Sequence, residues 1–464
     1  MRENTRQETL DDPKLQLALY TATGRLMDHR KKAIGGGKLP EFQDLRSRAA
    51  AVKRHTLDYL DVYLTQFEAA VQANGGKVIW ARDGAEAADF ILSLAKEKGE
   101  SLIVKSKSMT SEEIHLNDRL IKHELETVET DLGEYIIQLA GLRPYHIVAP
   151  ALQMTRYDVS TLFEEKLGVA KDDVIENQTM TARRVLREKF LAAGIGITGA
   201  NFLVADSGAV VIVENEGNAR LSSSAPKIQV AIAGIEKMIP RVRDLGVFLA
   251  LLGRSATGQA LTSYTSILSG PRRKDERDGP EEFYVVLLDA GRTKLLADKE
   301  KRESLQCIRC GACLNHCPVY RKVGGHSYPW VYSGPIGKII TPQFQGKEKD
   351  PWLPFMSSLC GVCAEVCPVK IDIPKMLLAL RRESQKSPDD AGAMKWFARM
   401  MTRPWLYRLA ASFGLGWLGR KDGVWLKEVK WPASSGPLKD WLAVRDFPAP
   451  PERSFRDWWE KRKK

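Results

Sequence analysis

The sequence predicts an α/β amino-terminal domain with a mostly parallel sheet, then a helical, cysteine-rich domain and an irregular tail rich in tryptophan. Three observations predict this arrangement. Short apolar strand patterns alternate with helical patterns over roughly the first 290 residues. All seven cysteines lie between Cys307 and Cys367. Eight of the eleven tryptophans lie at or beyond Trp396.

The predicted boundaries divide the chain into four segments. They are a helical amino-terminal segment (1–60), an α/β domain (61–297), a cysteine-rich domain (298–385) and a basic, Trp-rich carboxy-terminal region (386–464). A chain of 464 residues is long enough for two or three domains that each bury a core.

Within the α/β domain, apolar runs predict strands at 77–81, 102–105, 126–129, 146–148, 228–233 and 284–288. Helical patterns cover 85–98 and 181–193, and Thr110 with Glu113 predicts a capping box at the start of another helix. The turn Asp206-Ser207-Gly208, between two apolar runs, predicts a hairpin. Strands that alternate with helices imply a parallel sheet covered by helices.

Charge and cysteine usage limit the function classes. The net charge is +12, and the tail from Lys386 has 17 Lys and Arg against 9 Asp and Glu. This basic charge favours an acidic partner or a membrane surface, whereas no nucleic-acid reader module is recognisable. The sequence has no apolar run long enough to span a membrane and no signal segment, so we expect a cytoplasmic protein. Clustered cysteines in odd number favour metal ligation over disulfides.

The cysteine spacing indicates iron–sulfur clusters and a ferredoxin-like domain. Residues 307–318 follow C-x2-C-x2-C-x3-C-P, and 357–368 repeat this pattern with Ser357 in place of the first cysteine. In two-cluster bacterial ferredoxins the last cysteine of each run binds the other cluster. This crossing predicts one [4Fe–4S] cluster on Cys307, Cys310, Cys313 and Cys367, and a second cluster on Cys317, Cys360 and Cys363. Two zinc sites are the alternative, although zinc usually takes paired C-x2-C units.

The second cluster is one cysteine short. Its fourth position falls to Ser357, to water or to nothing, so both a [3Fe–4S] cluster and a [4Fe–4S] cluster with a non-cysteine ligand stay open. His316 and His326 are further candidates, but a histidine in such a loop more often only forms hydrogen bonds. The aromatic, turn-rich segment 324–335 is expected to pack beside the clusters and to limit water access.

Two other segments carry candidate site residues. Glu214, Glu216 and Arg220 follow a predicted strand. At the carboxyl edge of a parallel sheet they would line a pocket for a carboxylate or thioester substrate, with a polar surface loop as the alternative. Lys105–Ser108 follows another strand, where an anion could bind at the N-terminus of the following helix, with solvated lysines as the alternative. The G-x-G-x-x-G match at 194–199 follows a predicted helix and precedes a strand, the reverse of a dinucleotide site, so we interpret it as a glycine turn.

Several longer motifs resemble those of the lactate utilization protein B family. They are A-T-G-R-L-M-D-H-R from Ala22, T-L-D-Y-L-D-V-Y-L-T-Q-F-E from Thr56, G-I-G-I-T-G-A-N-F-L-V-A-D-S-G from Gly194, N-E-G-N-A-R-L from Asn215, both cysteine runs and the Trp-rich tail. The resemblance covers nearly the whole chain. It implies a LUD domain similar to sugar-phosphate isomerases and CoA transferases, and two [4Fe–4S] clusters.

The resemblance also implies a function. The family cooperates with two partner proteins in oxidising L-lactate to pyruvate, so we expect an electron-transfer component that passes electrons to an acceptor, rather than the subunit that dehydrogenates lactate. The alternative is that the α/β domain itself binds or converts a carboxylate or thioester, with structural clusters. We expect a cytoplasmic location. The alternative is a peripheral location, in which the tail contacts the inner face of the membrane. No catalytic residue is assigned.

Overall fold

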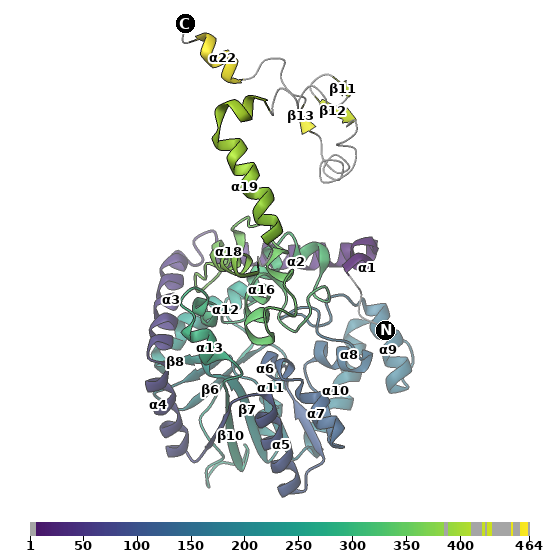
Figure 1. Ribbon diagram of the computed structural model, residues 1–464. Helices are drawn as coiled ribbons and strands as arrows, with labels where there is room; N and C mark the ends of the chain where they lie inside the picture. The colour runs from purple at the N-terminus through teal and green to yellow at the C-terminus, as the bar shows by residue number, and fades with distance from the viewer. Residues whose placement is uncertain are drawn as a thin grey trace. The chain divides into compact units, whose positions relative to one another are not determined.

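The computed structural model describes residues 6–384, 388–409, 420–422, 425–428, 447–448 and 455–462. The chain forms two compact units, residues 1–384 and residues 385–464. The first unit contains the α/β fold (Figure 1). All seven cysteines also belong to this unit. Nothing in this division separates the α/β part from the cysteine-rich part, so the predicted boundary near residue 298 stays a prediction.

A six-stranded parallel sheet is the centre of the first unit, in the order β1-β10-β7-β4-β2-β3. Its strands are β1 (Lys77–Ala81), β10 (Glu282–Leu288), β7 (Ile228–Gly234), β4 (Ile195–Thr198), β2 (Leu102–Lys105) and β3 (Glu126–Glu129). Every residue of β4 and β7 is buried, as expected for a parallel sheet with both faces covered. This confirms the predicted α/β fold class.

Alternate side chains of the strands point to two different cores. On β7, Val230 and Ile232 pack in the core that includes α5 (Gly84–Lys98) and α7 (Leu116–Lys122). Ala231 and Ala233 pack in the core on the other side, which includes α4 (Leu60–Ala73). Because successive side chains of a strand alternate between faces, one apolar run can supply both cores.

A smaller mixed sheet, in the order β8-β5-β6-β9, lies beside the second core. Its strands are β8 (Met238–Ile239), β5 (Phe202–Val204), β6 (Ala209–Glu214) and β9 (Tyr264–Leu268). Strands β5 and β6 are antiparallel, which confirms the hairpin predicted around Asp206-Ser207-Gly208. Glu214 therefore ends a strand of this mixed sheet, and not a strand of the parallel sheet as the pocket hypothesis assumed.

Two local predictions are wrong. Residues 146–148 form bends and no strand, because Nδ1 of the His146 ring accepts the N–H groups of Val148 and Ala149 at 3.0 and 3.3 Å. The predicted capping box at Thr110 is also absent. Instead Ser108 caps α6 (Met109–Glu113) by accepting the N–H of Ser111 at 3.3 Å.

The glycines of the G-x-G-x-x-G match pack tightly against protein atoms. Gly194 lies between α10 (Ile175–Ala192) and β4, whereas Gly196 lies within β4 and Gly199 follows that strand. A helix precedes the match, as predicted, but residues 195–198 form a strand and not the predicted glycine turn. A Cβ atom at Gly196 would lie 1.8 Å from the carbonyl oxygen of Ser222. Close packing inside the fold therefore accounts for Gly196.

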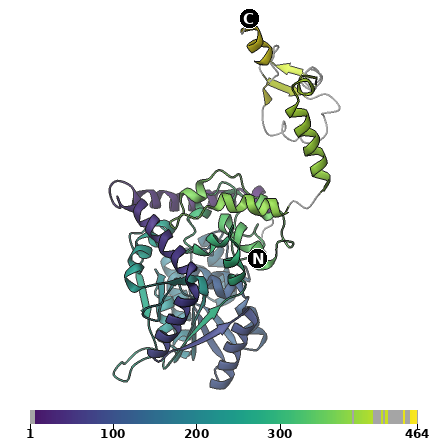
Figure 2. The same cartoon turned by 60° about the vertical axis from the view of Figure 1, so that its left-hand side comes forward.

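The amino-terminal helices α2 (Pro13–Ile34) and α3 (Phe42–Asp58) pack on the cysteine-rich part and on α12 (Val242–Ala256) (Figure 2). In particular, α2 contacts α14 (Ala312–His316) and α15 (Tyr320–Val323). Segments from the two ends of the first unit therefore lie side by side. This places residues of α2 and α3 next to the cysteines.

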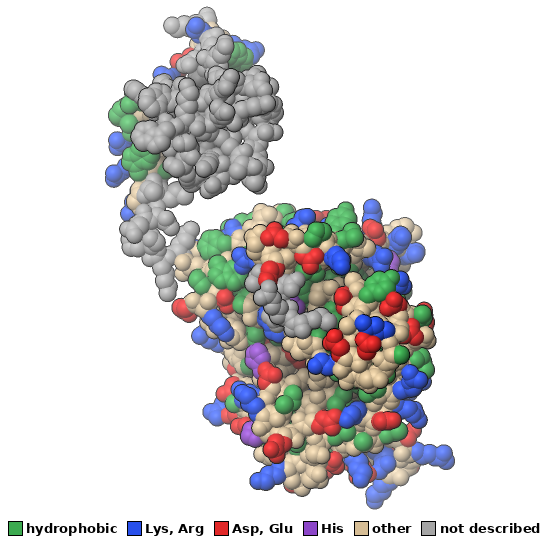
Figure 3. Space-filling model, turned by 90° about the vertical axis from the view of Figure 1, so that its right-hand side faces the viewer, with side chains coloured by type: hydrophobic (Ala, Val, Ile, Leu, Met, Phe, Trp, Pro, Cys, Tyr) green, Lys and Arg blue, Asp and Glu red, His purple; other side chains and the backbone are tan. Residues whose placement is uncertain are grey.

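The cysteine-rich part continues through α16 (Gly334–Gln345), α17 (Val362–Glu365) and α18 (Ile373–Ser384). On the face of the first unit drawn in Figure 3, basic and acidic side chains are interspersed.

Between α15 and α16, Tyr328 and Tyr332 are each 1% exposed. They belong to the same core as the cysteines, as predicted for segment 324–335.

The second unit contains α19 (Pro388–Thr402), a small sheet of β11 (Arg420–Asp422), β12 (Trp425–Glu428) and β13 (Phe447–Pro448), and α22 (Phe455–Arg462). Much of the predicted irregular tail lies outside the described residues. The side chains of Trp396, Trp405, Trp458 and Trp459 are exposed. No helix in the described ranges is long and apolar enough to cross a membrane.

Candidate iron–sulfur site

The structure gathers the seven cysteines into two groups. Four of them line one small cavity together with apolar side chains of Ile147 and Ile336: Cys307, Cys310, Cys313 and Cys367. The other three are close enough that the charges of Cys317 and Cys360 raise the pKa of Cys363. Each group thus combines cysteines from both runs. Cys360 is exposed, whereas Cys310, Cys317 and Cys367 are buried.

Burial makes thiolates unfavourable at these positions unless a positive charge is present. It raises the pKa of Cys310 and Cys367 to about 12, and neighbouring thiolates add to this effect. For Cys363 burial, followed by the charges of Cys317 and Cys360, raises the pKa to about 11. A bound iron–sulfur cluster would supply the missing positive charge, since a thiol that ligates a metal is deprotonated.

Backbone N–H groups point at two sulfurs of the four-cysteine group. The N–H of Arg309 donates to Sγ of Cys307, and the N–H of Ile371 donates to Sγ of Cys367, each at 3.4 Å. Gly311 has φ +73°, and a Cβ atom there would lie 3.2 Å from Val148. Both the left-handed conformation and the tight contact with the loop of the α/β part therefore favour glycine at this position.

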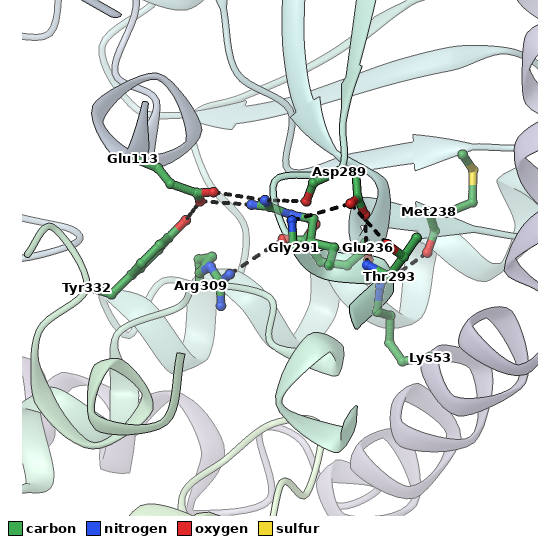
Figure 4. Close-up of polar contacts among 10 residues, drawn as sticks. Lys53, Glu113, Glu236, Met238, Asp289, Gly291, Thr293, Arg309 and Tyr332 are labelled. Carbon is green, nitrogen blue, oxygen red and sulfur yellow. Dashed lines mark hydrogen bonds and ion pairs between the residues drawn. The ribbon is translucent and has the colours of Figure 1, made fainter. Parts of the chain in front are cut away.

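A buried network of charges lies beside this group and joins it to the sheet (Figure 4). Arg292 donates to Glu236 at 2.5 Å and to both carboxylate oxygens of Glu113 at 2.8 Å. The hydroxyl of Tyr332 also donates to Glu113, at 2.7 Å. Arg309 approaches Glu236 at 3.5 Å and stacks 4.6 Å from the centre of the Tyr332 ring.

Two buried lysines near the network have lowered pKa values. Lys53 donates to the carbonyl oxygens of Glu236 and Met238 at 2.5 and 3.2 Å (Figure 4). Burial lowers the pKa of Lys53 to about 7 and that of Lys237 to about 8, against the opposing charge of Glu236. Burial alone would raise the pKa of Glu236, but Arg292 and Arg309 outweigh it and lower the value to about 2.

The amino-terminal helices add two arginines to the second cysteine run. Arg46 on α3 donates to the carbonyl oxygens of Cys367 and Ala364 at 2.8 and 3.2 Å. Arg30 on α2 donates to the carbonyl oxygen of Val366 at 3.1 Å. Both guanidinium groups lie close enough to Cys367 for its charge to raise their pKa, although burial lowers the pKa of each overall. One cation from α2 and one from α3 therefore lie against the end of the second cysteine run.

The residues present fit an iron–sulfur cluster in the four-cysteine cavity. The donors are soft thiolates, which such clusters require. Arg309 lines the cavity, and its Nε and Nη1 atoms are buried with no hydrogen-bond partner among the described residues. A buried donor without a partner is costly, and sulfide or thiolate of a bound cluster would accept from it.

The two histidines considered as ligands form backbone contacts instead. His316 Nδ1 lies 2.9 Å from the carbonyl oxygen of Ala312, and His326 Nε2 lies 2.8 Å from that of Arg143. His146, which the sequence did not single out, lies closer to the site. Its Nε2 is 3.0 Å from Oδ1 of Asn315, between two cysteines of the first run.

A second, larger cavity of about 260 Å³ adjoins the first cysteine run. It is lined by Glu214 and Glu216, by Lys107 and Ser108 after β2, and by Lys237, Arg309 and Cys310. The two segments that the sequence suggested as pocket residues therefore meet in one place. Arg220 is not among the residues that line the cavity; its N–H donates to Glu214 at 2.8 Å.

The carboxylates of this cavity are held by backbone groups. Glu214 accepts from the N–H of Ala219 at 2.8 Å, and Glu216 accepts from the N–H of Leu132 at 3.0 Å. Burial and then the charge of Asp131 raise the pKa of Glu216 to about 7. Lys237 is 8% exposed, and its ammonium group forms no hydrogen bond or ion pair within the described part of the chain.

Sequence reasoning missed the cations around the cysteines: Arg30, Arg46, Lys53, Lys237 and Arg309. Two of these residues could have been recognised from the sequence, because they lie within its motifs. Arg309 lies inside the first cysteine run, and Arg30 ends the motif that begins at Ala22. Nothing local distinguishes the others from surface lysines and arginines, because only the tertiary fold buries them.

Fold and site together define an iron–sulfur protein in which two cysteine runs are packed on an α/β domain. Comparison with known proteins supports this class. A LUD domain matches residues 64–288, a 4Fe-4S dicluster domain matches 303–371, and the carboxy-terminal domain of lactate utilisation protein B matches 375–464.

The chain belongs to the lactate utilization protein B family. It is 43% identical to lactate utilization protein B of Bacillus velezensis, over 98% of this chain and 96% of that protein. The protein of the same name from Bacillus licheniformis is also 43% identical, over 98% of this chain and 95% of that protein. Lactate utilization protein B of Bacillus thuringiensis is 42% identical, over 98% of this chain and 96% of that protein.

One solved structure was also found, a DUF162 family protein from Deinococcus radiodurans. It is 13% identical, with a TM-score of 0.28, and the match covers 49% of this chain and 98% of that chain.

Proposed function

We propose that the chain is an iron–sulfur electron-transfer component of a multi-protein system that oxidises L-lactate to pyruvate. The observation that carries the proposal is the cavity lined by four cysteines from two runs, beside a second group of three. Membership of the lactate utilization protein B family supports L-lactate as the substrate of this system. The partners in this proposal are the two other proteins of the lactate utilization system and an electron acceptor.

The proposed ligands are crossed between the runs. Cys307, Cys310, Cys313 and Cys367 would hold one [4Fe–4S] cluster, and Cys317, Cys360 and Cys363 would hold part of the second. When bound, the clusters supply one-electron transfer. The residues around them position the sulfurs: N–H groups of Arg309 and Ile371 point at sulfur. Tyr328 and Tyr332 are buried in the same core as the cysteines and help to exclude water from it.

The two proposed sites differ in their access to solvent. The thiols of Cys310 and Cys367 are buried, and the cavity they line adjoins the α/β domain. Cys360, in the other group, is exposed. Electron transfer between proteins requires close approach, so the second site is the one suited to exchange with a partner.

The crossed ligand sets are tested by two matched variants of the anaerobically prepared protein. Cys317→Ala should remove the second cluster and leave the first, although Cys317 belongs to the first run. Cys367→Ala should do the opposite. Iron and sulfide analysis with EPR of the reduced protein measures both. Loss of the first cluster in Cys317→Ala, with the second retained, would contradict the assignment.

A specific observation favours a second role, in which the α/β domain binds a small carboxylate. The larger cavity contains a buried ammonium, Lys237, without a partner in the described residues, and Lys107 lines the same space. An anion there would compensate these charges. Since Arg309 and Cys310 also line the cavity, such a ligand would lie against the proposed first cluster.

A cytoplasmic location and a docking role for the tail belong to the same proposal. Helix α19 carries the exposed aromatic side chains of Trp396 and Phe397 next to Lys395 and Arg399. Aromatic residues and arginine are enriched at protein interfaces. A partner subunit is the proposed contact, and binding of the full-length chain to anionic vesicles would instead favour the inner membrane surface.

A further inference from the structure

The second cysteine loop keeps the backbone of a complete cluster-binding loop, even though its first cysteine is replaced by Ser357. In the first loop Arg309 and Gly311 have φ values of +59° and +73°. At the matching positions of the second loop, Leu359 and Gly361 have φ values of +54° and +86°. Left-handed conformations are uncommon for residues other than glycine, so this agreement reflects a shared loop geometry.

The hydrogen bonds that follow are also the same. After Gly311 the N–H of Leu314 donates to the glycine carbonyl oxygen at 3.0 Å, and after Gly361 the N–H of Ala364 does so at 3.0 Å. Each loop enters a short helix at this point, α14 in the first case and α17 in the second. The two loops therefore follow one path on both sides of their central cysteines.

The side chain of Ser357 occupies the place in its loop that the sulfur of Cys307 has in the first. The N–H of Arg309 donates to Sγ of Cys307 at 3.4 Å. The N–H of Leu359 donates to Oγ of Ser357 at 3.2 Å. In each loop the side-chain atom at the first position accepts the N–H two residues later, so Ser357 Oγ is directed as a ligand atom would be.

Neighbouring side chains hold Ser357 in this position. Arg381 on α18 donates to the carbonyl oxygen of Ser357 at 2.8 Å and to that of Pro354 at 3.0 Å. The buried ammonium of Lys338 donates to the carbonyl oxygen of Met356, the residue before Ser357. Both cations are thus fixed against the backbone at Ser357 and Met356, and their positive charge favours a negatively charged group nearby.

We propose that Ser357 is the fourth protein ligand of the second cluster, through its Oγ atom. The inference rests on the proposed function, which places that cluster on Cys317, Cys360 and Cys363. Coordination forms an oxygen–iron bond and releases the hydroxyl proton to solvent, with no change in oxidation state. Oxygen is a harder donor than thiolate and favours ferric iron, so this ligand lowers the reduction potential of the second cluster.

The test compares three variants of the full chain, prepared anaerobically. Ser357→Ala should lose about one iron per chain on mild oxidation, with the EPR signal of an oxidised [3Fe–4S] cluster. Ser357→Cys should keep that iron and raise the reduction potential of the second cluster only. Ser358→Ala is the control, because Ser358 is the exposed neighbour and should behave as the unmodified protein does.

Two results would overturn the assignment of Ser357. One is an unmodified protein that loses iron as readily as Ser357→Ala. The other is a Ser357→Cys protein whose second cluster keeps its potential. The signal of the first cluster is an internal reference: if the unmodified protein contained no cluster at all, the proposed function would fail, and not merely the role of Ser357.

Discussion

Arg292 and Glu113 are joined by two hydrogen bonds of 2.8 Å in the buried layer between the parallel sheet and the first cysteine run (Figure 4). Their side chains are 1% and 3% exposed. Tyr332 of the cysteine-rich part donates to the same carboxylate. The α/β part and the cysteine-rich part thus share one polar core, in keeping with their place in a single compact unit.

Arg292→Met should strongly destabilise the first unit. The substitution leaves the carboxylates of Glu113 and Glu236 buried without their main partner, and such a loss costs about 3–5 kcal/mol. Urea unfolding followed by near-UV circular dichroism measures the change. Arg82→Met is the control, because the Arg82–Glu86 pair lies at the surface and its loss should leave the midpoint unchanged. Equal midpoints for the two variants would contradict the role of the network.

Gly311→Ala and Gly361→Ala should differ in their effect. Both glycines have positive φ, so alanine costs about 1–2 kcal/mol at either position. At Gly311 the added Cβ atom also meets Val148 at 3.2 Å, whereas no atom lies within 4 Å at Gly361. Gly311→Ala should therefore reduce incorporation of the first cluster much more than Gly361→Ala reduces the second. Iron content and EPR intensity measure both, and the reverse order would refute the argument.

The free energy of unfolding should decrease as the pH is lowered, because of His146. Burial, with a smaller contribution from Lys107, lowers the pKa of His146 to about 4, and the ring is held neutral because Nδ1 accepts backbone N–H groups. In the unfolded chain the pKa of His146 is about 6.5. The stabilising contribution of the neutral ring is complete above this pH and is lost as the pH falls below it. Between pH 7.5 and 5 the loss is about 2 kcal/mol.

The His146→Gln variant isolates this effect, since glutamine does not titrate in that range. The free energy of unfolding should fall less between pH 7.5 and 5 in the variant than in the unmodified protein, by about 2 kcal/mol. The same slope in both proteins would show that His146 does not carry the pH dependence.

Lys237→Gln should weaken binding of small carboxylates to the larger cavity. A charged hydrogen bond contributes about 1.5–3 kcal/mol, so the dissociation constant should rise roughly tenfold to a hundredfold. Anaerobic calorimetry with L-lactate, pyruvate and inorganic phosphate separates a carboxylate site from a general anion site. Lys227→Gln is the matched control, because Lys227 is exposed at the opposite end of β7. Equal affinities in both variants would rule out Lys237 as the contact.

Much of the fold could be predicted because its signals are local. Strands β1, β2 and β3 lie where the apolar runs indicated, and the Asp206-Ser207-Gly208 turn forms the hairpin. Segment 146–148 was misassigned because an apolar run does not show that His146 will take up the neighbouring N–H groups. The capping signal at Thr110 competed with an equally good cap at Ser108.

The candidate site could be predicted only in part, for a similar reason. Cysteine spacing identifies the candidate ligands, since three positions of each cluster lie within one short loop. The surrounding cations come from distant segments: Arg30 and Arg46 from α2 and α3, Lys53 from α3, and Lys237 after β7. Their role depends on burial beside the cysteines, which no local pattern encodes.

Reduction of the clusters by substrate tests the central proposal most directly. The anaerobic protein would be mixed with L-lactate, with and without the two other proteins of the lactate utilization system, and the EPR spectrum recorded after freezing. We expect the signal of reduced clusters only when lactate and the partner proteins are both present, and its loss when an electron acceptor is added. Clusters that keep one redox state throughout, in a mixture that forms pyruvate, would contradict the electron-transfer role.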